Sequence, residues 1–360
     1  MRPGESPVRP LFVTADDVLL DDLLRLAAGA GVSPDLATDA AAARRQWASA
    51  SLVLVGTDLA EAVSRAEPVR RDNVCLVTND LDDASVWKRA VDVGAETVLV
   101  LPDGEAALRE LLADTIDGGS PNAVTLSVVG GCGGAGASVF ASGLALAAAD
   151  RRLRVLLVDG DPLGGGIDLT LGAEDTAGLR WPDLMGTSGR VSAPTLRAAL
   201  PEIKQLAVLS WDRGDLLSVP AELMRAVVTA GQRGGDLVVV DLPRRLDAAA
   251  EEALVRSTCT LLVVPAEVRA VASAARVAAQ LRLVASDLRL VVRGPGQSGL
   301  DGSLIADTLS LPLAAQMRPD SSLAEALDRG LGPMRRPRGP LALACAQVLD
   351  SHRLQARAAA

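Results

Sequence analysis

The sequence Gly130-Gly-Cys-Gly-Gly-Ala-Gly-Ala-Ser138 lies between an apolar run, Ala123–Val129, and a stretch of helical periodicity, Val139–Ala149. A strand, a glycine-rich turn and a helix in this order direct backbone N–H groups and a helix N-terminus at a phosphate. Glycines suit such a loop because they accept positive φ angles and allow close approach of the backbone. This glycine loop, residues 130–138, therefore predicts a phosphate site, with a turn that merely packs helix on strand as the alternative.

The glycine loop departs from a complete phosphate-binding motif at one chemically important position. Gly131 and Gly136 have the GxxxxG spacing of a P-loop, but Ala137 follows where the motif has lysine. Ser138 stands where a hydroxyl group reaches Mg²⁺. The loop thus keeps its glycines and its hydroxyl group and lacks its cation.

Carboxylates end two further apolar runs. The segment Arg154–Asp161 reads RVLLVDGD and places Asp159 and Asp161 at the end of a predicted strand, and DLVVVDL places Asp241 at the end of another. Open α/β sheets bind ligands at the carboxyl ends of their strands. Because a buried carboxylate is costly to desolvate, these positions favour a role linked to an ion.

These segments together resemble one protein family. Cys132-Gly-Gly-Ala-Gly-Ala-Ser138 resembles the KGGxGK[ST] loop of the MinD/ParA ATPases, and most of all the KGGxGAS form of CpaE/TadZ-type proteins. Thr260–Pro265 and Leu311–Gly330 resemble later segments of the family, so the resemblance covers residues 123–332. By this match, Cys132 replaces the lysine that crosses the dimer interface, and Ala137 replaces the P-loop lysine.

The resemblance implies ATP and Mg²⁺ as cofactors, with Asp161 positioning the attacking water if ATP is hydrolysed. It implies that Mg²⁺ is held, directly or through water, by Ser138, Asp159 and Asp241. Arg293 stands near the place of the family's adenine-reading asparagine, so adenine preference is in doubt; an exposed strand-end arginine is an equal alternative. The residues implied to bind nucleotide are Gly131, Gly133, Gly134, Gly136, Ala137, Ser138 and Arg293.

The missing lysine has a calculable cost. A cation about 4 Å from a phosphate oxygen contributes on the order of 4 kcal/mol at an effective dielectric of 20. If this interaction forms in the transition state, its loss slows ATP hydrolysis roughly a thousandfold. Backbone N–H groups, the helix dipole and Mg²⁺ can still hold a nucleotide. We therefore expect weak or retained binding, and absent or very slow hydrolysis unless an arginine such as Arg244 supplies the charge.

The N-terminal region has a different pattern. Between residues 11 and 114, short apolar runs alternate five times with amphipathic stretches, which predicts a doubly wound, flavodoxin-like parallel sheet. This order resembles a response-regulator receiver, the domain that precedes the ATPase-like domain in CpaE/TadZ proteins. The third run ends in Val55-Gly56, where receivers have the phosphorylated aspartate, and the fifth in Leu101-Pro102, where they have lysine. We expect a docking or dimerising module, with Asp16 and Asp17 as a helix N-cap.

The whole chain is therefore predicted to be α/β, with two doubly wound parallel-sheet domains. The predicted boundaries are a receiver-like domain at residues 1–116, a turn-rich linker at residues 117–122, and a P-loop domain at residues 123–360. The length of 360 residues suits two domains, and the scarcity of aromatic residues suits cores of alanine, valine and leucine.

Composition excludes several other classes. The net charge of −9 argues against a broadly basic nucleic-acid binder, although Arg335, Arg336 and Arg338 form a local cluster typical of a solvated loop. The four cysteines are too far apart for a zinc site or a disulfide framework, and His352, the single histidine, excludes His-based triads. With no signal-peptide pattern, we expect a cytoplasmic protein. Residues 341–354 are expected to pack on the domain rather than lie on a membrane.

The resemblance implies a spatial-organiser protein that forms a homodimer. Its implied partners are cell-division proteins at the septum or the Flp/Tad pilus and secretion machinery at a pole, with peripheral membrane contact left open. Three alternatives stand beside this hypothesis. They are a working ATPase with a relocated cation, a scaffold with an empty glycine loop, and a ParA-like DNA-partitioning protein.

Overall fold

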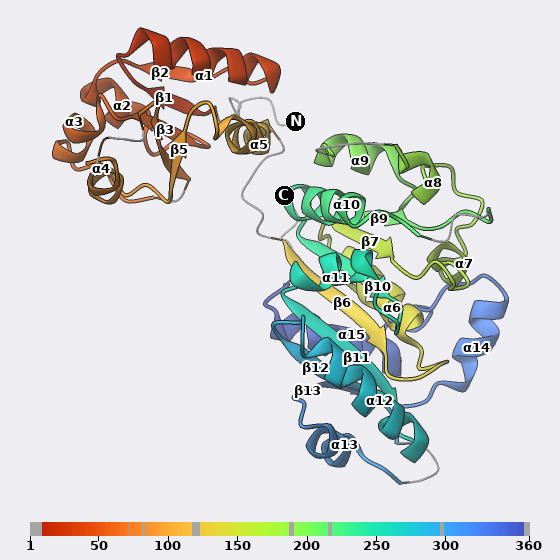
Figure 1. The fold of residues 1–360 in the computed structure, drawn as a ribbon. Coiled ribbons are helices and arrows are strands. Elements are labelled where there is room, and N and C mark those ends of the chain that lie inside the picture. Colours follow the sequence, from red (N-terminus) through yellow and green to blue (C-terminus); the bar gives the residue numbers. More distant parts are fainter. Residues whose placement is uncertain are drawn as a thin grey trace. The chain divides into compact units, whose positions relative to one another are not determined.

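The computed structural model describes residues 9–71, 73–80, 83, 85–116, 123–186, 191–214, 218–295 and 299–355. The chain divides into two compact units, Met1–Ser120 and Pro121–Ala360, which Figure 1 colours from red to orange and from yellow to blue. The predicted linker at residues 117–122 lies outside the described residues.

The N-terminal unit is a parallel five-stranded sheet in the order β2-β1-β3-β4-β5. Its strands are β1 (Leu11–Val13), β2 (Asp35–Ala37), β3 (Val53–Gly56), β4 (Val74–Thr78) and β5 (Thr97–Val100). Its helices are α1 (Asp17–Gly29), α2 (Ala40–Gln46), α3 (Ala60–Arg65), α4 (Val86–Val93) and α5 (Glu105–Ile116). The predicted flavodoxin-like, doubly wound sheet is confirmed.

Alternation along the strands divides the core of this unit between the two faces of the sheet. Leu11 and Val13 pack in one apolar cluster with α2, α3 and α4, while Phe12 packs in the other with α1 and α5. Successive strand residues point to opposite faces, so both faces of a central strand must be apolar when helices cover both. The five-fold alternation is confirmed, although α3 has only six residues and too little periodicity to be located from the sequence.

The C-terminal unit is an eight-stranded sheet in the order β13-β12-β11-β6-β10-β7-β9-β8. Its strands are β6 (Val124–Gly130), β7 (Val155–Asp159), β8 (Glu202–Ile203), β9 (Leu206–Leu209), β10 (Leu237–Leu242), β11 (Cys259–Pro265), β12 (Leu288–Arg293) and β13 (Leu313–Met317). All neighbouring strands are parallel except the edge pair β8 and β9, which is antiparallel. The prediction of a doubly wound parallel sheet is confirmed, with one addition: the edge strand β8 runs antiparallel, and its two residues are too few to form a recognisable pattern in the sequence.

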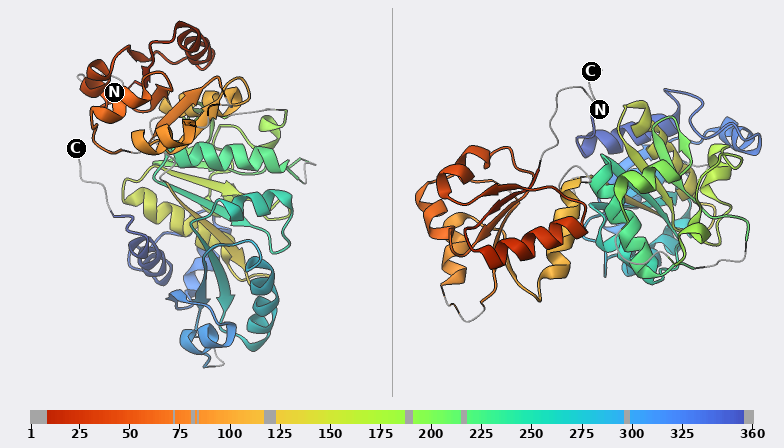
Figure 2. Two further views of the ribbon diagram at one scale, coloured as in Figure 1. Left: turned by 60° about the vertical axis from the view of Figure 1, so that its left-hand side comes forward. Right: turned by 90° about the horizontal axis from the view of Figure 1, so that it is seen from above.

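Helices cover both faces of this sheet. They are α6 (Ala137–Asp150), α7 (Ile167–Leu171), α8 (Trp181–Leu184), α9 (Ala193–Ala199), α10 (Ala221–Gly234), α11 (Ala248–Val255), α12 (Val268–Leu281), α13 (Gly302–Leu309), α14 (Ser321–Asp328) and α15 (Pro340–Ser351). Figure 2 shows α6 in yellow-green and α15 in dark blue on one face, with α10 to α12 in green and teal on the other.

The C-terminal helix is part of the core. Leu341, Cys345, Val348 and Leu349 of α15 are buried against α6 and the sheet. The prediction that this segment packs on the domain is therefore confirmed. The arrangement explains why α6 is apolar nearly all round, because it lies between the sheet and α15. Within the described part of the chain, no helix combines the length and apolar character needed to cross a bilayer.

The sheet order fixes where the candidate site forms. Strand β6, which leads into the glycine loop, lies between β11 on one side and β10 on the other. Strand β7 follows β10, and Asp241 is the register partner of Asp159. The carboxyl ends of these parallel strands meet at one edge of the sheet, beside the N-terminus of α6.

Candidate functional site

The glycine loop is a preformed turn rather than a loose connection. Strand β6 ends at Gly130, and α6 begins at Ala137 with Gly136 as its N-cap. Gly134 and Gly136 have φ angles of 67° and 88°, a left-handed conformation that glycine adopts without steric cost. The predicted strand, glycine turn and helix are all present.

The start of the glycine loop is packed tightly against β11 and α12. The amide of Gly131 donates a hydrogen bond of 2.8 Å to the carbonyl oxygen of Val263. A Cβ atom at position 131 would lie 2.8 Å from Cβ of Ala274 and 2.9 Å from Cγ2 of Val264. Gly131 is therefore required by close packing, and the neighbouring elements hold the loop in place.

Ser138 and Asp241 meet beside the loop, as the predicted metal site requires. The Asp241 carboxylate accepts a hydrogen bond from Ser138. Asp241 is 2% exposed, and burial, followed by the nearby charge of Asp159, raises its pKa well above the ordinary value. A buried carboxylate and a hydroxyl group form an oxygen donor set of the kind that Mg²⁺ takes in proteins.

Asp159 is held by three donors, so part of its task is structural. Its carboxylate accepts hydrogen bonds from the amide of Ile167 at 2.9 Å, Oγ of Ser210 at 3.0 Å and the amide of Asp161 at 3.3 Å. Burial raises the pKa of Asp159 to about 6 despite these bonds. Its carbonyl oxygen also accepts a 2.7 Å hydrogen bond from Nε1 of the buried Trp181.

Asp161 lies closer to solvent than the other two carboxylates. It is half-buried and accepts a hydrogen bond of 3.1 Å from the amide of Leu163. Among the described residues, no three His, Cys, Asp or Glu side chains are placed to hold a metal ion by themselves. A Mg²⁺ ion bound at Ser138 and Asp241 would take its remaining ligands from water and phosphate, as Mg²⁺ usually does.

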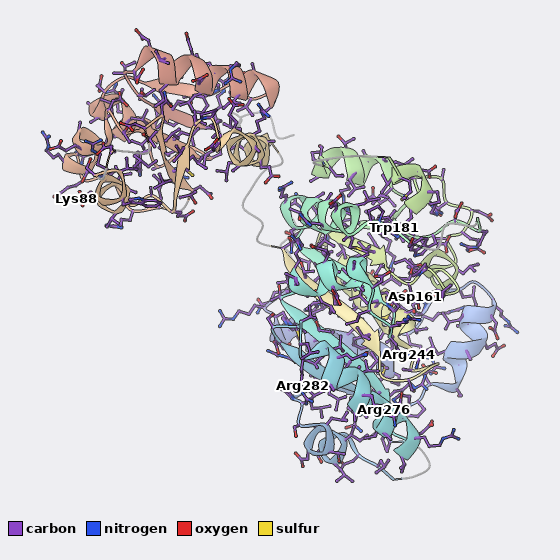
Figure 3. The ribbon with its side chains drawn as sticks, in the orientation of Figure 1. Lys88, Asp161, Trp181, Arg244, Arg276 and Arg282 are labelled. Carbon is purple, nitrogen blue, oxygen red and sulfur yellow. The ribbon has the colours of Figure 1, made fainter. Side chains whose placement is uncertain are left out.

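Two arginine side chains lie against the glycine loop. Nη2 of Arg244 is 3.7 Å from the position that a Cβ of Gly133 would occupy, and Nη1 of Arg293 is 3.2 Å from the equivalent position at Gly136. Figure 3 shows Asp161 and Arg244 at the same edge of the C-terminal sheet. Within the described residues neither arginine has an ion-pair or hydrogen-bond partner. The structure thus places both sequence candidates at the loop.

A cavity of about 400 Å³ adjoins the glycine loop on the β12 side. Its wall is mainly apolar and includes Val139, Phe140, Met317 and Leu323. Charged residues at this cavity, which we call the side cavity, are Glu267, Arg293, Arg318 and Asp320. An apolar hollow with a few polar groups is the usual form of a site for a small organic molecule.

An ionic cluster around the buried carboxylate of Asp168, beyond β7, was missed from the sequence. Asp168 is 4% exposed and lies 3.1 Å from Nη2 of Arg213 and 3.8 Å from Nε of Arg180. Ser210 is within 3.4 Å of the same carboxylate. These groups fix α7 against the end of β7. In the sequence, the only sign of this segment was the glycine run at residues 164–166, which directly precedes it.

In the N-terminal unit, the side chains of Asp58 and Thr14 occupy the space beside Gly56, where a receiver has its phosphorylated side chain. A Cβ at Gly56 would lie 2.3 Å from Oδ1 of Asp58 and 2.8 Å from Oγ1 of Thr14. Asp58, which was missed from the sequence, accepts hydrogen bonds from Oγ1 of Thr14 at 2.9 Å and from the amide of Ala15 at 2.7 Å. The predicted N-cap is confirmed for Asp16, which accepts hydrogen bonds from the first turn of α1.

The other residues singled out in the sequence lie in ordinary surroundings. All four cysteines are free; Cys75, Cys259 and Cys345 are buried and Cys132 is half-buried. Burial raises the pKa of the Cys75 thiol to about 11 and that of Cys259 to about 12. His352 caps α15 and lies 3.0 Å from the carbonyl oxygen of Val348. The three clustered arginines are exposed; they are Arg335, Arg336 and Arg338.

Comparison with known proteins gives relatives for each unit. A family model described as the Rv3660c-like, CheY-like N-terminal domain matches residues 13–123. The uncharacterized protein Rv3660c of Mycobacterium tuberculosis strain H37Rv is 41% identical over 338 residues, which cover 93% of this chain and 95% of that protein.

Solved structures of the MinD/ParA group share the fold. A ParA family ATPase from Chlorobium tepidum has a TM-score of 0.56 at 18% identity, covering 64% of this chain and 99% of its own. A chain of the MinC:MinD cell division protein complex from Aquifex aeolicus has a TM-score of 0.54 at 21% identity, covering 66% and 99%. MinD from Pyrococcus horikoshii, solved with Mg-ADP, has a TM-score of 0.51 at 19% identity, covering 64% and 96%.

Proposed function

The chain belongs to the family of Rv3660c-like proteins, and on that premise we propose that it is a nucleotide-binding spatial organiser of the CpaE/TadZ type. It recruits cell-division proteins or Flp/Tad pilus and secretion machinery to a septum or a pole. Its MinD/ParA-like unit binds ATP and Mg²⁺ weakly and hydrolyses ATP very slowly or not at all. The receiver-like unit serves as a docking module.

The observation that carries this proposal is the preformed glycine loop with Ser138 hydrogen-bonded to Asp241. A turn that only joined a strand to a helix would not need two left-handed glycines followed by a serine hydrogen-bonded to a buried carboxylate. The residues proposed to bind nucleotide are Gly131, Gly133, Gly134, Gly136, Ala137 and Ser138 of the loop, together with Arg293. In this proposal Asp159 and Asp241 hold Mg²⁺, directly or through water. Asp161 positions the attacking water if ATP is hydrolysed.

The same loop supports slow hydrolysis. Cys132 and Ala137 provide no positive charge where the MinD/ParA loop has lysines. Loss of a cation close to the transferred phosphoryl group removes on the order of 4 kcal/mol of transition-state stabilisation. Binding survives this loss better than catalysis because backbone N–H groups and the α6 dipole act on the ground state as well.

A homodimer formed through the P-loop unit completes the proposal. In the MinD/ParA resemblance the signature lysine reaches across the dimer to the partner's nucleotide, and Cys132 replaces it here. Dimerisation is therefore expected to depend less on nucleotide than in a lysine-bearing protein. Leu163, which follows Asp161 and is 80% exposed, supplies apolar surface close to this edge.

The N-terminal unit supports a docking role over a phosphorylation switch. Asp58 and Thr14 occupy the space that an acceptor side chain at position 56 would need, and Asp58 is held there by hydrogen bonds from Thr14 and the amide of Ala15. A receiver fold without its acceptor aspartate keeps the surfaces that bind other proteins but cannot be switched by phosphorylation. Such a unit is suited to binding another protein constitutively.

Three assays test this proposal: they measure ATP binding, ATP hydrolysis and the position of the protein in the cell. Equilibrium dialysis of the full chain with labelled ATP and Mg²⁺ should show binding, while phosphate release stays near the background rate. A fluorescent fusion in the native host should form foci at poles or septa, and Ser138→Ala should weaken nucleotide binding. No binding at millimolar ATP would refute the nucleotide part, and a diffuse wild-type fusion would refute the spatial part.

Two rival functions give different results in the same assays. Rapid phosphate release would identify a working ATPase with a relocated cation, a candidate favoured by the position of Arg244 at Gly133. Salt-dependent retention on duplex DNA would instead indicate a ParA-like partitioning protein.

A further inference from the structure

The candidate nucleotide site has two chemically different ends, set by the order of the strands. Strands β10 and β7, which carry Asp241 and Asp159, lie on one side of β6. Strands β11, β12 and β13, which border the apolar side cavity, lie on its other side. A nucleotide along the glycine loop would place its terminal phosphate and metal by the carboxylates and its nucleoside in the side cavity.

Arg244 belongs to the carboxylate end. It follows β10, the strand that ends with Asp241 and Leu242. Its Nη2 atom lies 3.7 Å from the position that a Cβ of Gly133 would occupy, in the part of the glycine loop that precedes Gly134. It is exposed and has no partner among the described residues, so its guanidinium group is available to an incoming anion. Gly133 directly follows Cys132, where the family resemblance places a lost lysine.

Arg293 belongs to the cavity end. It is the last residue of β12, lines the side cavity, and brings Nη1 close to Gly136 at the N-terminus of α6. It is half-buried and likewise has no partner in the described part of the chain. Gly136 directly precedes Ala137, the position of the other lost lysine.

We propose that Arg244 and Arg293 supply the positive charge that the glycine loop lacks, as a clamp that grips the phosphates of the same subunit's nucleotide from opposite sides of β6; this inference rests on the proposed nucleotide-binding function. Arg293 contacts the phosphate next to the nucleoside, so it acts on diphosphates and triphosphates alike. Arg244 contacts the terminal phosphate of a triphosphate and thereby distinguishes it from a diphosphate. It binds this phosphate equally well before and during the reaction, so it raises affinity and leaves hydrolysis slow.

Arginine is chemically suited to this task. The guanidinium group is always charged, is planar and offers several N–H donors that match phosphate oxygens in pairs. It also reaches further than a lysine rooted in the loop, so it can come from a neighbouring strand end. The triphosphate would then meet positive charge at both ends of a loop that contains none.

The experiment compares the full-length protein with Arg244→Gln, Arg293→Gln and the control Arg245→Gln, which alters an adjacent exposed arginine. Isothermal titration calorimetry measures binding of Mg²⁺ with AMP-PNP and with ADP. Loss of one charge-assisted interaction is expected to weaken binding roughly 10- to 100-fold. Thermal unfolding without nucleotide should be unchanged, since neither arginine contacts a described charged group.

The two variants are predicted to differ in pattern. Arg244→Gln should weaken AMP-PNP binding and leave ADP binding nearly unchanged, whereas Arg293→Gln should weaken both ligands to a similar degree. Arg245→Gln should match the wild type. Adding Ala137→Lys to Arg293→Gln should restore binding of both ligands, because the new cation arises beside the lost one.

Failure of the arginine clamp and failure of the nucleotide-binding proposal would give different results. A wild-type protein that binds neither ligand overturns the nucleotide-binding proposal itself. A wild-type protein that binds, with affinities untouched by both glutamine variants, overturns the clamp and leaves the proposed function standing. Equal loss of AMP-PNP and ADP in Arg244→Gln overturns the assignment of that arginine to the terminal phosphate.

Discussion

Replacement of Gly131 by alanine should destabilise the C-terminal unit, because the start of the glycine loop is packed tightly against its neighbours. The added Cβ would meet Cβ of Ala274 at 2.8 Å, Cγ2 of Val264 at 2.9 Å and the carbonyl oxygen of Val263 at 3.3 Å. All three neighbours are fully buried, so they have little freedom to move aside. Overpacking of this kind costs about 1–3 kcal/mol.

The consequence can be measured by calorimetry of the full chain. For a unit of about this size, each kcal/mol shifts the unfolding temperature by about 2–4 °C, so Gly131→Ala should lower that of the C-terminal unit by roughly 2–12 °C. Nucleotide affinity should fall as well, because relief of the clash moves the loop away from β11.

A matched glycine separates packing from backbone strain. Gly134 has a φ of 67° and open space around its missing Cβ. Gly134→Ala should therefore cost only about 1 kcal/mol, from the left-handed conformation alone. If Gly131→Ala unfolded like the wild type, or if Gly134→Ala were the more damaging change, the loop could not be packed as described.

Three further predictions concern other parts of the chain. Trp181→Phe should lower the free energy of unfolding by about 1–3 kcal/mol in urea titrations, because the buried carbonyl oxygen of Asp159 loses its donor; an unchanged midpoint would contradict the 2.7 Å hydrogen bond. Thiol titration of the native protein at pH 8 should find Cys132 reacting first and the three buried cysteines slowly, and Mg²⁺-ATP should protect Cys132; four equally reactive thiols would refute this. Acetyl phosphate should not label the N-terminal unit, and Gly56→Asp should destabilise it rather than create an acceptor, since Asp58 occupies the space; a stable, phosphorylated variant would show the opposite.

Much of the architecture could be predicted from the sequence because buried parallel strands have a strong signal. Runs such as Val74–Thr78 and Leu237–Leu242 are continuous and apolar, and each ends in a turn or a charged residue. The five-fold βα alternation and the strand–loop–helix unit follow from the same periodicity. Short elements such as α3 and β8 carry too few residues to establish a pattern.

The candidate site was predictable only where its residues are adjacent in sequence. The glycine loop and the strand-end carboxylates could be named because a motif and a strand end define them. Asp168 and Arg213 lie 45 residues apart and meet only through the packing of α7 against β7 and the segment after β9. Arg244 was one of several arginines that could reach the loop, and the fold, rather than the spacing, brings it to Gly133.

The receiver-like unit gives a second example of this limit. The sequence indicates that the third strand ends in glycine where an acceptor aspartate is expected. It does not indicate that Asp58, two residues later, turns back to Thr14 and fills the vacant volume. That contact depends on β1 and β3 being neighbours in the sheet, which only the topology establishes.

The most direct test of the central claim compares binding with turnover in one full-length preparation. Labelled ATP with Mg²⁺ is measured by equilibrium dialysis, and phosphate release is followed in the same sample. The account predicts saturable binding that Ser138→Ala weakens, with phosphate release close to that of buffer alone. Absence of binding at millimolar ATP, or release as fast as that of a lysine-bearing ATPase, would contradict it.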